Sequence, residues 1–99
     1  MNLGLGSVQF GLDYGIANPQ GKTLPGEVTA ILALAAEHGI KVLDTATSYG
    51  DSEAVLGRAL NPEQPFHIVS KTRYFRLPAI AEDDGATLQA DFRASLERL

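Results

Sequence analysis

The chain has 99 residues, which fits one small domain, and its 44% hydrophobic and 20% charged residues are typical of globular proteins. Its formal net charge of -4 argues against nucleic acid or an anionic membrane as a partner, because both attract basic surfaces. It contains no cysteine, which excludes disulfides, thiol chemistry and thiolate metal sites, and we predict no metal site of another kind.

The N-terminal residues carry no charged leader before an apolar stretch, so we expect no signal peptide. No apolar run approaches the roughly 20 residues that span a bilayer. The lack of cysteine fits a reducing compartment, and we therefore expect a cytoplasmic protein.

The first part of the chain predicts a strand, a loop and a helix. A short glycine-rich strand is expected over Leu3–Gln9, and turn residues mark a loop over Gly11–Leu24. Pro25 suits the first turn of a helix, where its missing N–H costs nothing. Apolar residues then recur at helical spacing until Gly39, which predicts a helix over Pro25–His38.

The second part continues the alternation of strands and helices. Strands are expected over Ile40–Thr45 and Phe66–Thr72. Between them, Asp51 or Ser52 is expected to cap a short helix that ends near Leu60. A loop that contains Pro78 and Asp83-Asp84-Gly85 is expected to lead to a last helix, on which Leu88, Phe92, Leu96 and Leu99 form one apolar stripe.

The resulting βαβαβα order implies an α/β fold with a parallel sheet and helices packed against it. A crossover helix normally leads to another parallel strand, but none follows the last helix of this sequence. We therefore expect the third strand to keep an open edge and the stripe of the last helix to lack part of its partner surface.

Two ionisable residues are placed where parallel α/β folds form active sites. Asp44 ends the second strand and Lys71 ends the third, so both are expected at the C-terminal rim of the sheet. Tyr49 lies on the loop between them. An ammonium near a phenol favours the phenolate, which makes the phenol a better general acid, and Asp44 would keep Lys71 charged and oriented.

These residues belong to a series of motifs that resembles the aldo-keto reductase family. The matching segments, in chain order, are Gly4-Leu5-Gly6-Ser7, Glu37-His38-Gly39-Ile40, Asp44-Thr45-Ala46, Tyr49-Gly50-Asp51-Ser52-Glu53 with Leu56-Gly57, Ser70-Lys71-Thr72 and Ser95-Leu96-Glu97-Arg98-Leu99. Each segment alone is weak evidence for the family, but together they occur in the family's order and cover essentially the whole chain.

The resemblance implies the N-terminal portion of a (β/α)8 TIM barrel, with residues 1–99 forming part of one barrel domain. It also implies NADPH-dependent reduction of an aldehyde, ketone or sugar carbonyl. In the roles that it implies, Tyr49 is the proton donor, Lys71 tunes it, and Asp44 pairs with Lys71 near the nicotinamide ribose. Gly6, Ser7, Val8 and Gln9 would line the nicotinamide end of the cofactor, together with Asp44.

The resemblance also shows what this sequence lacks. The family's catalytic histidine ends a fourth strand that would begin past Leu99, and most of the surface for the adenosine 2′-phosphate lies in the last strands and helices. We therefore expect the 99 residues alone to be inactive. An alternative of another class is a non-catalytic interaction module that self-associates through its open sheet edge.

Two further patterns have ordinary structural explanations. Gly15–Thr23 nearly spells a phosphate-binding loop, but it has one residue too many between its glycines, and Pro19 removes an N–H from the supposed cradle. We therefore predict that this segment is a surface turn. That the chain is a phosphate-binding fragment of an NTPase is kept as a third hypothesis. Glu53 is expected to be a first-turn acid that faces the helix dipole, without a catalytic role.

Overall fold

A computed structural model describes residues 2–75, 78–79 and 81–99. Three short strands, β1 (Gly4–Gly6), β2 (Val42–Asp44) and β3 (His67–Val69), form one parallel sheet in the order β1-β2-β3. The pairing sets Gly6 against Asp44 and Asp44 against Val69, so the three strands end at one common rim. The predicted α/β class, the parallel sheet and the open third strand are confirmed.

Four helices complete the described fold: α1 (Val8–Gly11), α2 (Pro25–Glu37), α3 (Ser52–Ala59) and α4 (Glu82–Arg98). The core lies between the sheet and α1, α2 and α3 and is made of Phe10, Val28, Leu32, Leu43, Val55 and Leu56. Each of these side chains is at most 6% exposed. The apolar residues of α2 recur at helical spacing, and this places Val28 and Leu32 on the face that is buried in the core.

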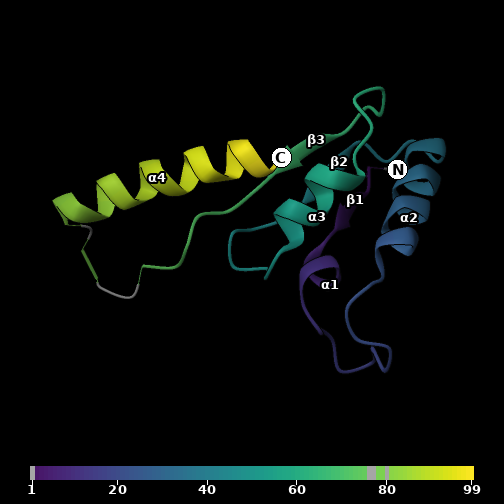
Figure 1. Ribbon diagram of the computed structural model, residues 1–99, viewed down its shortest axis with the longest axis horizontal. Helices are drawn as coiled ribbons and strands as arrows, with labels where there is room; N and C mark the ends of the chain where they lie inside the picture. Colours follow the sequence, from purple (N-terminus) through teal and green to yellow (C-terminus); the bar gives the residue numbers. More distant parts are fainter. Residues whose placement is uncertain (1, 76–77, 80) are drawn as a thin grey trace.

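The last helix is only loosely attached to the rest of the fold (Figure 1). Its C-terminal end meets α3 and the sheet, whereas its N-terminal half extends away from them. Ser95 is the buried residue of α4 in the described structure, and the predicted stripe is largely uncovered, with Leu88 38%, Phe92 62% and Leu96 64% exposed. The expectation that this stripe lacks part of its partner surface is confirmed.

The predicted first strand is too long. Residues Ser7, Val8 and Gln9 were expected in it, but the strand ends at Gly6 and α1 begins at Val8. The backbone N–H and the hydroxyl of Ser7 both donate to the Asp44 carbonyl, at 3.0 and 2.8 Å, and the Phe10 N–H turns back to the Ser7 carbonyl. These bonds take the chain out of the ladder and into a helical turn.

The boundaries of the last helix and the cap of α3 also differ from the prediction. Asp83-Asp84-Gly85 was expected in a loop but lies in the first turn of α4, where Asp84 accepts from the Ala81 N–H at 2.9 Å. Acidic residues suit that position because the helix dipole is positive there. At α3, Asp51 occupies the N-cap position as predicted but makes no side-chain cap bond; its carboxylate pairs with Lys22 at 2.6 Å instead.

The segment Gly15–Thr23 is a surface loop, as its composition predicts. Its turns are closed by Asn18, whose amide donates to the carbonyls of Tyr14 and Gly21 at 3.0 and 2.8 Å. Helix α2 begins only at Pro25, two residues beyond the supposed phosphate loop. Among the described residues, no helix is long and apolar enough to cross a bilayer.

Candidate active site

The three ionisable groups named by the sequence meet at the C-terminal rim of the sheet. The Lys71 ammonium donates to Asp44 Oδ1 at 2.7 Å and to the Thr45 carbonyl at 2.9 Å. The same nitrogen lies 5.1 Å from the centroid of the Tyr49 ring, within the range of a cation–π contact. Asp44 comes from the end of β2, Lys71 from just past β3, and Tyr49 from the loop before α3.

The backbone beyond the strands fixes the position of Lys71. The Thr45 N–H donates to the Val69 carbonyl at 2.8 Å, and the Thr47 N–H donates to the Lys71 carbonyl at 3.0 Å. The β2–β3 pairing thus continues past the strand ends, and side-chain alternation turns Lys71 toward Asp44. Lys71 and Asp44 are 47% and 44% exposed, so their ion pair orients the ammonium and adds little to stability.

The hydrogen bond to Asp44 is the main reason why the pKa of Lys71 lies above its ordinary value, with the Tyr49 phenol adding to the shift. Partial burial of the ammonium opposes the shift but does not outweigh it. Lys71 is therefore a persistent cation beside the phenol, which is the electrostatic arrangement that a phenolic general acid needs.

The loop that carries Tyr49 is held in place by a close backbone approach. Gly50 has a φ of +57°, and Gly11 packs directly against the Tyr49 carbonyl and the Ser52 N–H. A Cβ at Gly11 would overlap these backbone atoms, so the loop packs against α1 too closely for any residue except glycine at this position. The Ser52 N–H also donates to the Tyr49 carbonyl at 3.0 Å, which ties the tyrosine to the start of α3.

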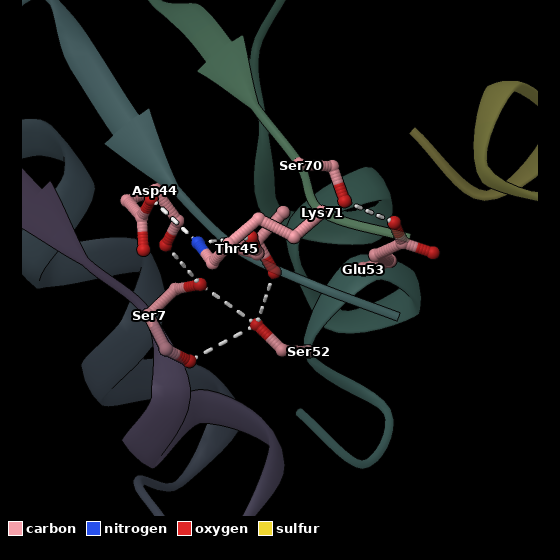
Figure 2. Close-up of polar contacts among 7 residues, drawn as sticks. All are labelled: Ser7, Asp44, Thr45, Ser52, Glu53, Ser70 and Lys71. Atoms are coloured by element: carbon pink, nitrogen blue, oxygen red, sulfur yellow. Dashed lines mark hydrogen bonds and ion pairs between the residues drawn. The ribbon is translucent and has the colours of Figure 1, made fainter. Parts of the chain in front are cut away.

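Beneath the site lies a buried hydroxyl cluster, defined as Ser7, Thr45 and Ser52, that the sequence did not reveal (Figure 2). All three residues are fully buried. The Ser52 hydroxyl lies 2.8 Å from the Ser7 hydroxyl, 2.9 Å from the Thr45 hydroxyl and 3.0 Å from the Ser7 carbonyl. Ser52 was expected to cap a helix, but its side chain joins α3 to the ends of β1 and β2.

A second buried feature is the carboxylate of Glu53, which is 3% exposed. It accepts from Ser70 at 2.6 Å, from Ser95 at 2.8 and 3.1 Å, and from Arg98 Nε at 2.9 Å. Glu53 lies in the first turn of α3, as predicted, but its carboxylate points inward to these donors, which the sequence did not indicate. The signal in the sequence is the spacing of Ser95 and Arg98, which places both on one face of α4.

Burial alone would raise the pKa of the Glu53 carboxyl, but the hydrogen bonds from Ser70, Ser95 and Arg98 outweigh it and hold the pKa below its ordinary value of 4.5. A carboxyl whose pKa is lower in the folded state than in the unfolded state stabilises the fold at pH values above its unfolded-state pKa. This stabilisation is lost as the pH falls through the folded-state pKa. Glu53→Gln should therefore lower the free energy of unfolding at pH 7, and the difference from wild type should shrink below about pH 4.5.

Urea unfolding of both proteins at pH 7 and at pH 3.5 measures this difference. Glu27→Gln, at an exposed first-turn acid of α2, is the matched control and should change the free energy of unfolding little at either pH. A Glu53→Gln difference of the same size at both pH values would contradict the assignment of Glu53 as a buried, ionised acceptor.

The residues proposed to line the cofactor lie in different environments. Gly6 ends β1 at the rim, and no atom lies within 4 Å of the position that a Cβ would take, so a flat ring could approach the backbone there. The Ser7 hydroxyl is committed to the buried cluster and offers no group to a ligand. Val8 and Gln9 are half-buried in α1. Among the described residues, no group of three His, Asp or Glu could hold a metal ion.

Known proteins resemble this chain over nearly its whole length. The sequence model of the Aldo/keto reductase family matches residues 2–99. The chain belongs to the aldo/keto reductase family. An aldo-keto reductase from Mycobacterium sp. (strain MCS) is 36% identical over 83 residues, which covers 80% of this chain and 27% of that protein.

Two solved structures of candidate aldo-keto reductases from Pseudomonas aeruginosa are similar in fold. One is 36% identical with a TM-score of 0.78, and the other is 33% identical with a TM-score of 0.76. Each comparison covers 97% of this chain but only 37% and 36% of the solved chain. The parallel sheet and its helices are thus the N-terminal part of an aldo-keto reductase barrel, and family membership supports an oxidoreductase.

Proposed function

We propose that residues 1–99 form the N-terminal part of one barrel domain that reduces a small carbonyl compound, an aldehyde, ketone or sugar, with NADPH. The observation that carries the proposal is the Lys71 ammonium, which is bound to Asp44 at 2.7 Å and lies 5.1 Å from the Tyr49 ring at the rim of the sheet. NADPH supplies the hydride when it is bound, and the chain supplies placement and electrostatics.

In this proposal Tyr49 donates the proton to the carbonyl oxygen of the substrate. Lys71 stabilises the negative charge that develops on the phenol oxygen, and Asp44 keeps the ammonium charged and aimed at the ring. Gly6 and Asp44 offer the exposed backbone and carboxylate for the nicotinamide end of the cofactor. Val8 and Gln9 would line the same end, whereas the fully buried Ser7 would act only by holding the ends of β1 and β2 together.

The chain spans little more than a third of the solved structures that it matches, so the site needs groups from the rest of a barrel. We expect no turnover by the 99 residues alone. A fusion of residues 1–99 to the complementary part of the Pseudomonas aeruginosa relative that is 36% identical gives a full-length protein, the joined barrel. We expect the joined barrel to oxidise NADPH in the presence of aldehyde or ketone substrates. The measurement is the loss of NADPH absorbance, with the complementary part alone as control.

NADPH-dependent turnover by the pure 99-residue chain would refute the expectation that the site needs groups from the rest of a barrel. A folded joined barrel that reduces no carbonyl compound, while the parent relative does so under the same conditions, would refute the proposed function.

A second candidate, a module that self-associates, is favoured by the uncovered apolar stripe of α4. Leu88, Phe92 and Leu96 are exposed, and β1 and β3 are both edge strands of the described sheet. Exposed edges and apolar faces favour association. Sedimentation of the isolated chain should then show a mass that rises with concentration, and a stable compact monomer at high concentration would count against this function.

A further inference from the structure

The first turn of α3 contains two adjacent residues whose side chains hold different parts of the site. Ser52 reaches the ends of β1 and β2 through the buried hydroxyl cluster. Glu53 reaches in another direction, to Ser70 beyond β3 (Figure 2). Its carboxylate also accepts from Ser95 and Arg98 on α4. The turn begins three residues after Tyr49, so the tyrosine and these contacts belong to one short segment.

Ser70 is the residue that links Glu53 to the ionisable groups of the site. It directly precedes Lys71, and neighbouring side chains of an extended segment point to opposite sides. The Ser70 hydroxyl accordingly donates to Glu53 Oε1 at 2.6 Å, while the Lys71 ammonium donates to Asp44 and the Thr45 carbonyl on the other side. Any rotation of this segment about its axis would break both sets of contacts together.

We propose that Glu53 and Ser70 are a positioning pair that sets the orientation of the segment after β3, and thereby brings the Lys71 ammonium onto Asp44 and the Tyr49 ring. Neither residue touches the reacting groups; both act through Lys71. The catalytic consequence rests on the proposed function, whereas the effect on the placement of Lys71 does not.

The competing explanation is that Glu53 only anchors α4. Ser95 and Arg98 both bond to its carboxylate, and the Arg98 carbonyl packs directly against Gly57 of α3. The two explanations differ in whether Ser70 matters for Lys71. If Glu53 is only an anchor, removal of the Ser70 hydroxyl should leave Lys71 in place. Removal of the Ser95 hydroxyl should then have the larger effect on the free energy of unfolding, since that serine contacts both carboxylate oxygens.

Ser70→Ala and Ser95→Ala form a matched pair, because each removes one hydroxyl that donates to the same carboxylate. The measurement is the titration of Lys71, followed by the ¹³Cε resonance in the 99-residue chain labelled with ¹³C-lysine. Ser70→Ala should lower the titration midpoint of Lys71 toward the ordinary value of 10.5, because the ammonium loses its fixed contact with Asp44. Ser95→Ala should leave the midpoint unchanged, and Ser70→Thr, which keeps a hydroxyl, should restore it.

An unchanged Lys71 midpoint in Ser70→Ala, or an equal shift in Ser95→Ala, would overturn the proposal. Ser70 is exposed, so its truncation leaves the core intact, and circular dichroism of each variant checks the fold. In the joined barrel, Ser70→Ala should lower kcat about tenfold with little change in KM. A joined barrel without activity would refute the proposed function, while the Lys71 titration would still decide the role of Glu53 and Ser70.

Discussion

Tyr49→Phe in the joined barrel is expected to lower kcat by at least about 100-fold, because a positioned general acid contributes roughly 10²–10⁴ to the rate. The KM for NADPH should change little, since the phenol hydroxyl acts on the substrate carbonyl and the ring itself remains. Steady-state kinetics with a fixed aldehyde substrate measure both constants.

Tyr74→Phe is the matched control for this variant. Tyr74 is 83% exposed and lies beyond Lys71, outside the groups assigned to the reaction, so its variant should keep the wild-type kcat. If Tyr49→Phe retained more than a tenth of the wild-type kcat, another group would be the proton donor, and the role given to Tyr49 would be wrong.

Leu56→Ala is expected to lower the free energy of unfolding of the 99-residue chain by about 2–5 kcal/mol, the range for truncation of a buried leucine that leaves a cavity. Leu56 is 0% exposed and packs in the core from α3, the helix whose first turn carries Ser52 and Glu53. A domain of this size has a total stability of about 5–15 kcal/mol, so this loss is a large part of it. Equilibrium urea unfolding measures the difference.

Leu96→Ala removes the same atoms from the apolar stripe of α4, where the side chain is 64% exposed. It should change the free energy of unfolding by no more than about 0.5 kcal/mol, as is usual for an exposed site. A loss at Leu96 equal to that at Leu56 would show that the stripe is covered in solution, and it would favour the self-association candidate.

The sequence predicted the arrangement of the rim because it depends on few physical rules. Parallel strands end at one edge, and side chains alternate along them, so Asp44 and Lys71 were placed together without knowledge of the contacts between them. The apolar spacing of α2 likewise predicted which face would be buried, and Val28 and Leu32 are both 0% exposed.

The sequence could not predict contacts that join residues far apart in the chain. Glu53 looks like an ordinary first-turn acid until Ser70, Ser95 and Arg98 are brought around it, and the last of these lies 45 positions away. The end of β1 was missed for a similar reason. The bonds that turn Ser7 out of the strand go to the Asp44 carbonyl, 37 positions away, and the residues near Ser7 in the sequence do not indicate them.

The proximity of the Lys71 ammonium and the Tyr49 ring is the feature on which the proposed proton donor depends. Nuclear Overhauser effects between the ε-methylene protons of Lys71 and the ring protons of Tyr49 measure it directly in the labelled chain. With the ammonium nitrogen 5.1 Å from the ring centroid, cross-peaks between these protons are expected. If these cross-peaks are absent while those that report the parallel pairing of Asp44 with Val69 are present, Lys71 does not lie against Tyr49 and cannot tune it.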